Sequence, residues 1–228
     1  SGTTTFAGSV GATTKLLGLT TDSAGTTTIS ATALTATTAT FNDPVTLGAN
    51  ATVTGTTVNF ANTVDGDAAD ARTLTVTASG NTTFGAVVGG TGALQALTTD
   101  SAGTTLLNGG TVTATTQTYA DDVKLGANTT LSGATVTFSK ALNGDLTASN
   151  RELTANANLV TTLGGTTGNS GVLNKLTTDA SGTTLLKSAV TATTQTYKDK
   201  VQLGGAATLT ATGGTVEFQK SVNGDTAS

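Results

Sequence analysis

The chain has 228 residues, of which 36% are hydrophobic, 11% are charged and only 4% are aromatic, while 59 are threonine and 29 are glycine. Its 14 acidic residues outnumber its 10 basic ones, which argues against nucleic-acid binding, because that function needs clustered basic residues. The lack of cysteine excludes a disulfide framework, and no apolar run approaches the roughly 18 residues of a membrane-spanning helix.

This composition predicts an all-β protein with many turns. Threonine and valine are β-branched and favour strands, whereas glycine disfavours helices. Disordered segments usually combine few aliphatic residues with a high net charge. The mean hydropathy of +0.07 and the net charge of −4 therefore favour a folded chain.

From the N-terminus onward, the expected elements are short strands separated by Gly, Asn and Asp. Residues 73–78 alternate between threonine and an apolar residue, and residues 122–125 and 135–138 alternate similarly. A period of two indicates a strand that buries one face. The side chains expected to point inward are Leu74, Val76, Val123, Leu125, Val136, Phe138, Val201, Leu203, Val216 and Phe218.

Internal repetition organises the whole chain. The sequence Leu-Thr-Thr-Asp begins at Leu19 and returns at Leu97 and Leu176, at intervals of 78 and 79 residues. We therefore expect a single continuous unit, 1–228, made of nearly three long repeats at about 2–79, 80–157 and 158–228. Aromatic residues recur with the same interval and are expected to occupy equivalent environments: Phe41, Tyr119 and Tyr197.

A shorter period lies inside each long repeat. Tyr119 and Phe138 are 19 residues apart in similar phrases, which suggests a unit of about 20 residues and about four coils per 78-residue repeat. We predict a right-handed parallel β-helix in which each Leu-Thr-Thr-Asp returns to the same angular position. At about 4.8 Å per coil, the rod would be about 55 Å long. The alternative is a β-sandwich, which would contain antiparallel hairpins.

Several phrases resemble the repeats of large bacterial surface proteins of the filamentous-haemagglutinin-like kind. They are Thr82–Phe84 with Val88–Gly90, then Leu97–Asp100, then Gln117–Tyr119 with Val123–Gly126. The likeness extends over essentially the whole chain at the level of repeat pattern. It implies a secreted or surface-held β-helix whose repeats form a shaft.

The charged residues indicate structural roles. Histidine is absent, and the only two arginines, Arg72 and Arg151, occupy equivalent places in successive repeats. We expect each to pair with a nearby turn carboxylate such as Asp70 or Glu152. No catalytic, cofactor-binding or metal-binding residue is predicted, and we expect the chain not to be an enzyme.

Three sets of aspartates also recur, and each is expected to form turns or cap backbone groups. Members of one set would lie roughly 19 Å apart, too far to share a calcium ion. One calcium ion at Asp65 and Asp67 is the metal site left open. The sets are Asp22, Asp100 and Asp179; Asp43, Asp121 and Asp199; and Asp67, Asp145 and Asp225.

Other short motifs are interpreted as turns. The segment Gly89–Gly92 carries no lysine and opens no helix, which argues against a phosphate-binding loop. Three glycosylation sequons begin at Asn50, Asn81 and Asn128, and chance matches are expected among so many threonines.

Ice binding by outward threonines is a rival function for a threonine-rich solenoid. Aligning the long repeats argues against it, because Thr73, Thr75 and Thr77 become Glu152, Thr154 and Asn156 one repeat later. A charge therefore interrupts the aligned positions.

The leading hypothesis is a non-catalytic shaft of an extracellular or bacterial cell-surface adhesin or fibre. The alternatives are a carbohydrate-binding or carbohydrate-cleaving β-helix and an ice-binding solenoid. The chain begins at Ser1 in mid-pattern without a methionine, so we expect it to be part of a longer chain or fibre. Its expected partners are neighbouring repeats of the same chain or head-to-tail copies, with glycans or proteins of host or neighbouring cells as further candidates. We expect no nucleic-acid partner and no membrane span.

Overall fold

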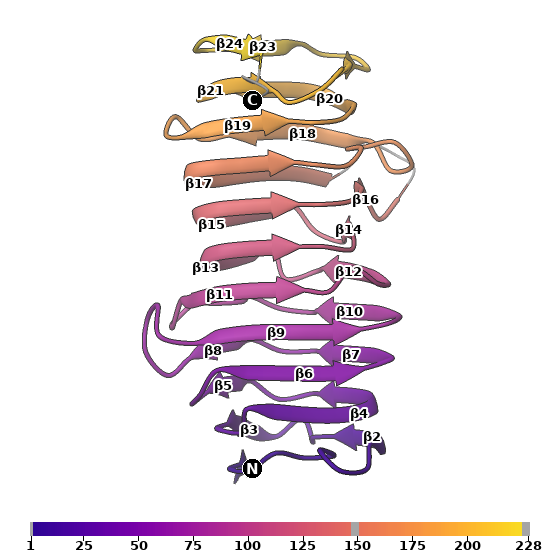
Figure 1. Cartoon of the computed structure of the whole chain (residues 1–228), viewed down its shortest axis with the longest axis vertical. Helices are drawn as coiled ribbons and strands as arrows, with labels where there is room; N and C mark the ends of the chain where they lie inside the picture. Colours follow the sequence, from indigo (N-terminus) through magenta and orange to yellow (C-terminus); the bar gives the residue numbers. More distant parts are fainter. Residues whose placement is uncertain (1, 147–150, 225–228) are drawn as a thin grey trace.

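The chain forms a right-handed parallel β-solenoid of about 11 turns (Figure 1). This is a computed structural model that describes residues 2–146 and 151–224. The described residues form 24 strands and no helix, and every strand pairing among them is parallel. The right hand is the one that parallel crossovers adopt almost without exception. The predicted fold class is confirmed, and the sandwich alternative is excluded.

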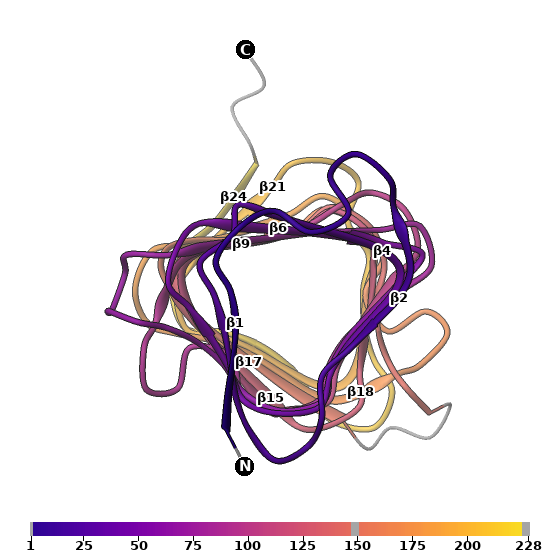
Figure 2. The same cartoon turned by 90° about the horizontal axis from the view of Figure 1, so that it is seen from below.

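Seen along its axis, the solenoid is a rounded triangle with three faces (Figure 2). The chain visits them in a fixed order, here called face 1, face 2 and face 3. Inward side chains identify the faces: Val45 and Val64 pair on face 1, Val53 and Val76 on face 2, and Ala39 and Val58 on face 3.

The strands are distributed evenly among the faces, and five long strands bend around a corner. Face 1 contains β1 (Gly2–Phe6), β3 (Gly25–Ile29), β5 (Val45–Leu47), β8 (Val64–Gly66), β18 (Leu173–Thr178) and β23 (Val216–Phe218). Face 2 contains β6 (Ala51–Gly55), β9 (Thr73–Ala78), β11 (Leu94–Thr99), β19 (Thr183–Leu186), β21 (Lys200–Leu203) and β24 (Val222–Gly224). Face 3 contains β2 (Leu16–Thr20), β7 (Thr57–Phe60), β10 (Asn81–Phe84), β12 (Thr104–Leu107), β14 (Asp122–Leu125), β16 (Leu142–Gly144) and β22 (Leu209–Ala211). The strands that span two faces are β4 (Ala33–Phe41), β13 (Thr111–Tyr119), β15 (Thr129–Phe138), β17 (Arg151–Leu163) and β20 (Val190–Tyr197).

The long repeat falls one face short of four whole coils. Leu19 on face 3 pairs with Ala39, which pairs with Val58, which in turn aligns with Thr82 three coils above Leu19. Thr82 pairs with Thr105 one coil later. Leu97, the next copy of Leu19, lies between these two positions, on face 2.

The prediction that Leu-Thr-Thr-Asp returns to one angular position is therefore wrong. The motif lies on face 3 at Leu19, on face 2 at Leu97 and on face 1 at Leu176, because each repeat contains about three and two-thirds coils. The prediction missed this shift because it assumed that every coil contains about 20 residues. Real coils differ in length, since Thr27 pairs with Val45 whereas Ala51 pairs with Leu74.

The core is a continuous apolar column inside the three faces. Of the ten side chains predicted to point inward, seven are fully buried. Leu203 and Val216 are partly buried against the core, and Phe218 is 38% exposed in the last described coil. Leu203 lies directly below that last coil. Inward alternation is therefore confirmed for the seven buried side chains, and the three less buried ones lie in the last two described coils.

Glycine is required at two recurrent corners. Gly89 has a φ of 68° and Gly103 a φ of 77°, a region that disfavours other residues. A Cβ on Gly89 would lie 2.1 Å from the Thr113 carbonyl oxygen, and one on Gly103 would lie 1.7 Å from that of Gly80. These corners thus let successive coils approach closely.

Candidate functional site

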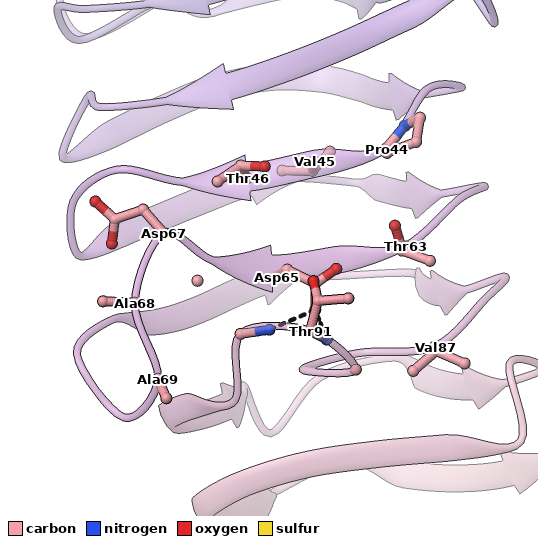
Figure 3. Close-up of a pocket in the computed structure, with 13 residues that line it drawn as sticks. Pro44, Val45, Thr46, Thr63, Asp65, Asp67, Ala68, Ala69, Val87 and Thr91 are labelled. Carbon is pink, nitrogen blue, oxygen red and sulfur yellow. Dashed lines mark hydrogen bonds between the residues drawn. The ribbon is translucent and has the colours of Figure 1, made fainter.

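A groove lies along the outer side of face 1 and reaches its corner with face 2 (Figure 3). It has a volume of about 720 Å³ and is lined by β5, β8 and the loop after β8. Asp65 Oδ1 accepts hydrogen bonds from the backbone N–H groups of Thr91 and Gly92, at 2.8 and 3.2 Å. The carboxylate thus caps backbone groups of residues 89–92. This segment is a turn, as predicted.

The second carboxylate of the groove, Asp67, is held by an arginine. Arg72 Nε and Nη2 donate to its two oxygens at 2.6 and 2.7 Å. Arg151 makes the same bidentate pair with Asp145, at 2.7 and 2.8 Å. Each arginine hydrogen bond lowers the pKa of its aspartate.

Both arginines therefore pair with turn carboxylates, but not with the residues that were named. Asp70 instead accepts a hydrogen bond from Thr115 Oγ1 at 2.7 Å, and Glu152 accepts one from Asn174 at 2.9 Å. The reason is geometric. In the first repeat, the loop after β8 places Arg72 beside Asp67, the first aspartate that follows the strand.

A recurrent cluster of one aspartate and two threonines lies at the corner after each long-repeat aromatic residue. Asp121 accepts hydrogen bonds from Thr99 Oγ1 at 2.7 Å and from Thr105 Oγ1 at 2.8 and 3.0 Å. Both threonines belong to the preceding coil, one on either side of the corner. The cluster ties two coils together. Its copies are Asp43 with Thr21 and Thr27, and Asp199 with Thr178 and Thr184.

These corner aspartates are buried, at 1% exposure for Asp43 and Asp121 and 0% for Asp199. Burial raises the pKa of Asp121 and of Asp199, and the threonine hydrogen bonds partly oppose that shift. The predicted role in forming turns or capping backbone groups is too simple for this set, because the side chains accept hydrogen bonds from threonine hydroxyls inside the rod. The spacing of Asp from two inward threonines was the available signal.

The Leu-Thr-Thr-Asp aspartates behave more nearly as predicted. Asp100 Oδ1 caps the backbone N–H of Ala78 at 2.9 Å. Burial raises the pKa of Asp179. No group of three or more potential metal ligands occurs within residues 2–146 and 151–224, and Asp225 lies outside the described residues. With Asp65 and Asp67 both engaged, the open calcium site gains no support.

Two of the three sequon asparagines bridge successive coils. Asn50 Oδ1 accepts from the backbone N–H of Thr73 at 3.0 Å, and Asn128 Oδ1 accepts from that of Glu152 at 3.1 Å. Asn81 begins β10 and is exposed. The prediction of structural turn positions is confirmed for Asn50 and Asn128.

The aromatic rings lie inside the rod rather than on its surface. Phe41 stacks on Phe60 with ring centroids 5.0 Å apart, and Tyr119 stacks on Phe138 at 5.2 Å. Tyr197 stacks on Phe218 at 5.2 Å. The three long-repeat aromatics thus have equivalent neighbours, as predicted. Sugar-binding sites usually need exposed rings, and among the described coils only Phe6 and Phe218, in the outermost ones, are partly exposed.

The repeat alignment used above to argue against ice binding compared outward residues that lie on different faces. Thr73, Thr75 and Thr77 lie on face 2, whereas Glu152, Thr154 and Asn156 lie outward on face 1. The charge of Glu152 therefore does not interrupt the threonines of face 2. The sequence-based argument against a continuous threonine surface is wrong, because each repeat turns by one face.

The fold and these contacts define a β-solenoid repeat protein. Comparisons with protein-family models, with curated proteins and with solved structures gave no match. Among the described residues, no helix is long and apolar enough to span a membrane.

Proposed function

We propose that the chain is a non-catalytic structural segment, the stiff shaft of an extracellular or bacterial cell-surface adhesin or fibre. The observation that carries this proposal is the unbroken core, in which parallel pairing runs through about 11 turns. A solenoid of this kind holds whatever is attached to it at a defined distance. The repeat phrases that resemble filamentous-haemagglutinin-like proteins support the same role.

Several polar groups of the described structure hold neighbouring coils or loops in place. The corner aspartates bind threonines of the preceding coil, and the groove carboxylates are occupied by backbone N–H groups and by Arg72. Such an arrangement stabilises a rod. It gives no support to the carbohydrate-cleaving alternative, which needs a pair of carboxylates facing a substrate.

The parallel pairing of successive coils suggests the partner. A strand edge presents unpaired backbone groups that another strand can bind. We propose that similar coils cover this edge, either from the same long chain or from a head-to-tail copy.

Insertion of an extra repeat tests the shaft. A second copy of residues 80–158 placed after residue 158 continues the coil, because Arg72 and Leu97 recur 79 residues later as Arg151 and Leu176. The rod measured by small-angle X-ray scattering should lengthen by about 18 Å at constant cross-section, since coils are about 4.8 Å apart. Broadening without lengthening would overturn the proposal.

A glycan array separates the shaft from the carbohydrate-binding alternative. The chain should bind no glycan on the array if it acts as a passive spacer. Saturable binding to a defined glycan would favour the alternative instead.

A further inference from the structure

Face 2 carries an uninterrupted column of outward threonines. Strand register places one threonine above another through six successive coils, in β6, β9, β11, β13, β15 and β17. Each is half-buried by its neighbours, with its side chain on the outer surface. The column consists of Thr52, Thr75, Thr98, Thr118, Thr137 and Thr162.

The hydroxyl groups of this column are available to an external ligand. None of the six hydroxyls has a hydrogen-bond partner among the described residues. By contrast, the inward threonines of the corner clusters donate to aspartates. Threonine is β-branched and stiff at χ1, so a stacked column presents its methyl and hydroxyl groups in a repeated, pre-ordered array.

The array extends in two dimensions. A parallel column two residues earlier on the same strands contains Thr73, Ala96, Thr116, Thr135 and Val160. The expected spacing is about 4.8 Å between coils and about 6.6 Å between alternate residues of one strand. These distances are comparable to the oxygen repeats on a prism face of ice, so bound waters can occupy positions close to lattice sites.

The strand segments that carry the column are uncharged, and the nearest charged residues, Arg72 and Asp100, lie just beyond their ends. Charged groups hold tightly oriented hydration shells that differ from the ice lattice, so their absence favours ice-like water. The segments of face 2 that carry the two columns contain no charged residue: 51–55, 73–78, 94–99, 115–119, 135–138 and 160–163.

Face 1 carries a second threonine column that provides an internal control. It contains Thr111, Thr130, Thr154, Thr177 and Thr196. Charged side chains flank this column, because Glu152 and Lys175 pair beside it. The two columns share residue type and spacing, but charged residues lie within the strands of face 1 and only beyond the strand ends on face 2.

We propose that the outer surface of face 2 binds ice through its threonine columns, with an ice crystal surface as the ligand. This activity goes beyond the proposed shaft, because a passive spacer needs no ordered outer face. It would give the rod a flat binding surface along about half of its length.

Thermal hysteresis and ice-affinity partitioning of the purified chain test the proposal. The unaltered chain should shape ice crystals, depress their growth temperature and concentrate in slowly grown ice. Thr118→Tyr places a bulky ring in the middle of the face 2 column and should reduce the hysteresis at least severalfold. The matched control, Thr154→Tyr on face 1, should retain it.

A second matched pair guards against a folding defect, with circular dichroism and the melting temperature recorded for every variant. Thr98→Lys on face 2 should reduce hysteresis, whereas Thr130→Lys on face 1 should not. Absence of ice activity in the unaltered chain would overturn the proposal. Equal losses from the face 1 and face 2 variants, with folding unchanged, would overturn it as well.

Discussion

The aromatic stacks of faces 3 and 2 begin at the same place in successive repeats but differ in the number of rings and in one hydroxyl group. On face 3, Phe41, Phe60 and Phe84 stack in series, with centroid distances of 5.0 and 5.5 Å. On face 2, Tyr119 stacks only on Phe138, and its hydroxyl donates to Gln117 Oε1 at 3.0 Å.

The Tyr119 hydroxyl is accompanied by a different residue two positions earlier in the chain. The position of Gln117 is occupied by Ala39 in the first repeat, where the ring is a phenylalanine. Gln117 Nε2 in turn donates to the carbonyl oxygens of Val112 and Ser132. A buried polar atom must be hydrogen-bonded, so tyrosine and glutamine occur together. The third repeat repeats this pair as Tyr197 and Gln195.

The largest expected effect is the loss of a ring from either stack. Phe138→Ala should lower the free energy of unfolding by about 3 to 5 kcal/mol, because it leaves a cavity in a closed core. Phe60→Ala should cost more, since Phe60 stacks on two rings and each such contact contributes about 0.5 to 1.5 kcal/mol. Urea denaturation followed by circular dichroism measures both. A loss below about 1 kcal/mol for Phe138→Ala would contradict its burial.

A smaller effect is expected from the hydroxyl itself. Tyr119→Phe leaves Gln117 Oε1 buried without its donor and should cost about 1 to 3 kcal/mol. The double variant Tyr119→Phe with Gln117→Ala recreates the Phe41 and Ala39 pair of the first repeat. It should be less destabilised than the sum of the two single variants, and strict additivity would show that the two residues act independently.

The corner aspartates should make the free energy of unfolding depend on pH. Burial raises the pKa of Asp121 above its usual value of 3.8. Its contribution to stability is thus full below the unfolded-state pKa and is lost as pH rises through the raised, folded-state pKa. Lowering the pH through this window should stabilise the unaltered chain relative to Asp121→Asn.

The contribution of Asp145 to stability should change with pH in the opposite direction. The Arg151 guanidinium lowers the pKa of Asp145, so its contribution to stability is present above the unfolded-state pKa and is lost as pH falls. Relative to Asp145→Asn, the unaltered chain should therefore lose stability on acidification. Parallel pH profiles for the two variants would contradict the assigned environments.

The smallest effect is expected from the arginines. Arg72 and Arg151 form surface ion pairs, which contribute little to stability. Arg151→Gln should leave the urea midpoint almost unchanged, and any difference should shrink in added salt. A large, salt-independent loss would show that the loop after Leu142–Gly144 depends on this pair.

Local patterns in the sequence predicted much of the fold. Alternation in 73–78 identified the buried Leu74 and Val76, and the returns of Leu-Thr-Thr-Asp identified the long repeat. The one-face rotation was not predictable from an assumed coil of constant length, because loops such as 67–72 add residues outside the strands.

The candidate surface was missed for the same reason. Thr73 and Glu152 align by repeat position, yet they lie on different faces because strand pairing, rather than sequence interval, determines which residues are neighbours. The corner clusters were likewise missed, because Asp121 and Thr99 belong to different coils and lie 22 residues apart in sequence.

The shift of one face per repeat makes the long repeats a screw. Gain or loss of one repeat by unequal recombination would turn the coils beyond it by about a third of a revolution, while the core remains in register. Gain of three repeats would restore the original azimuth. The number of repeats therefore sets both the length of the rod and the direction in which its far end points. A site that must point in one direction tolerates changes in repeat number only in steps of three.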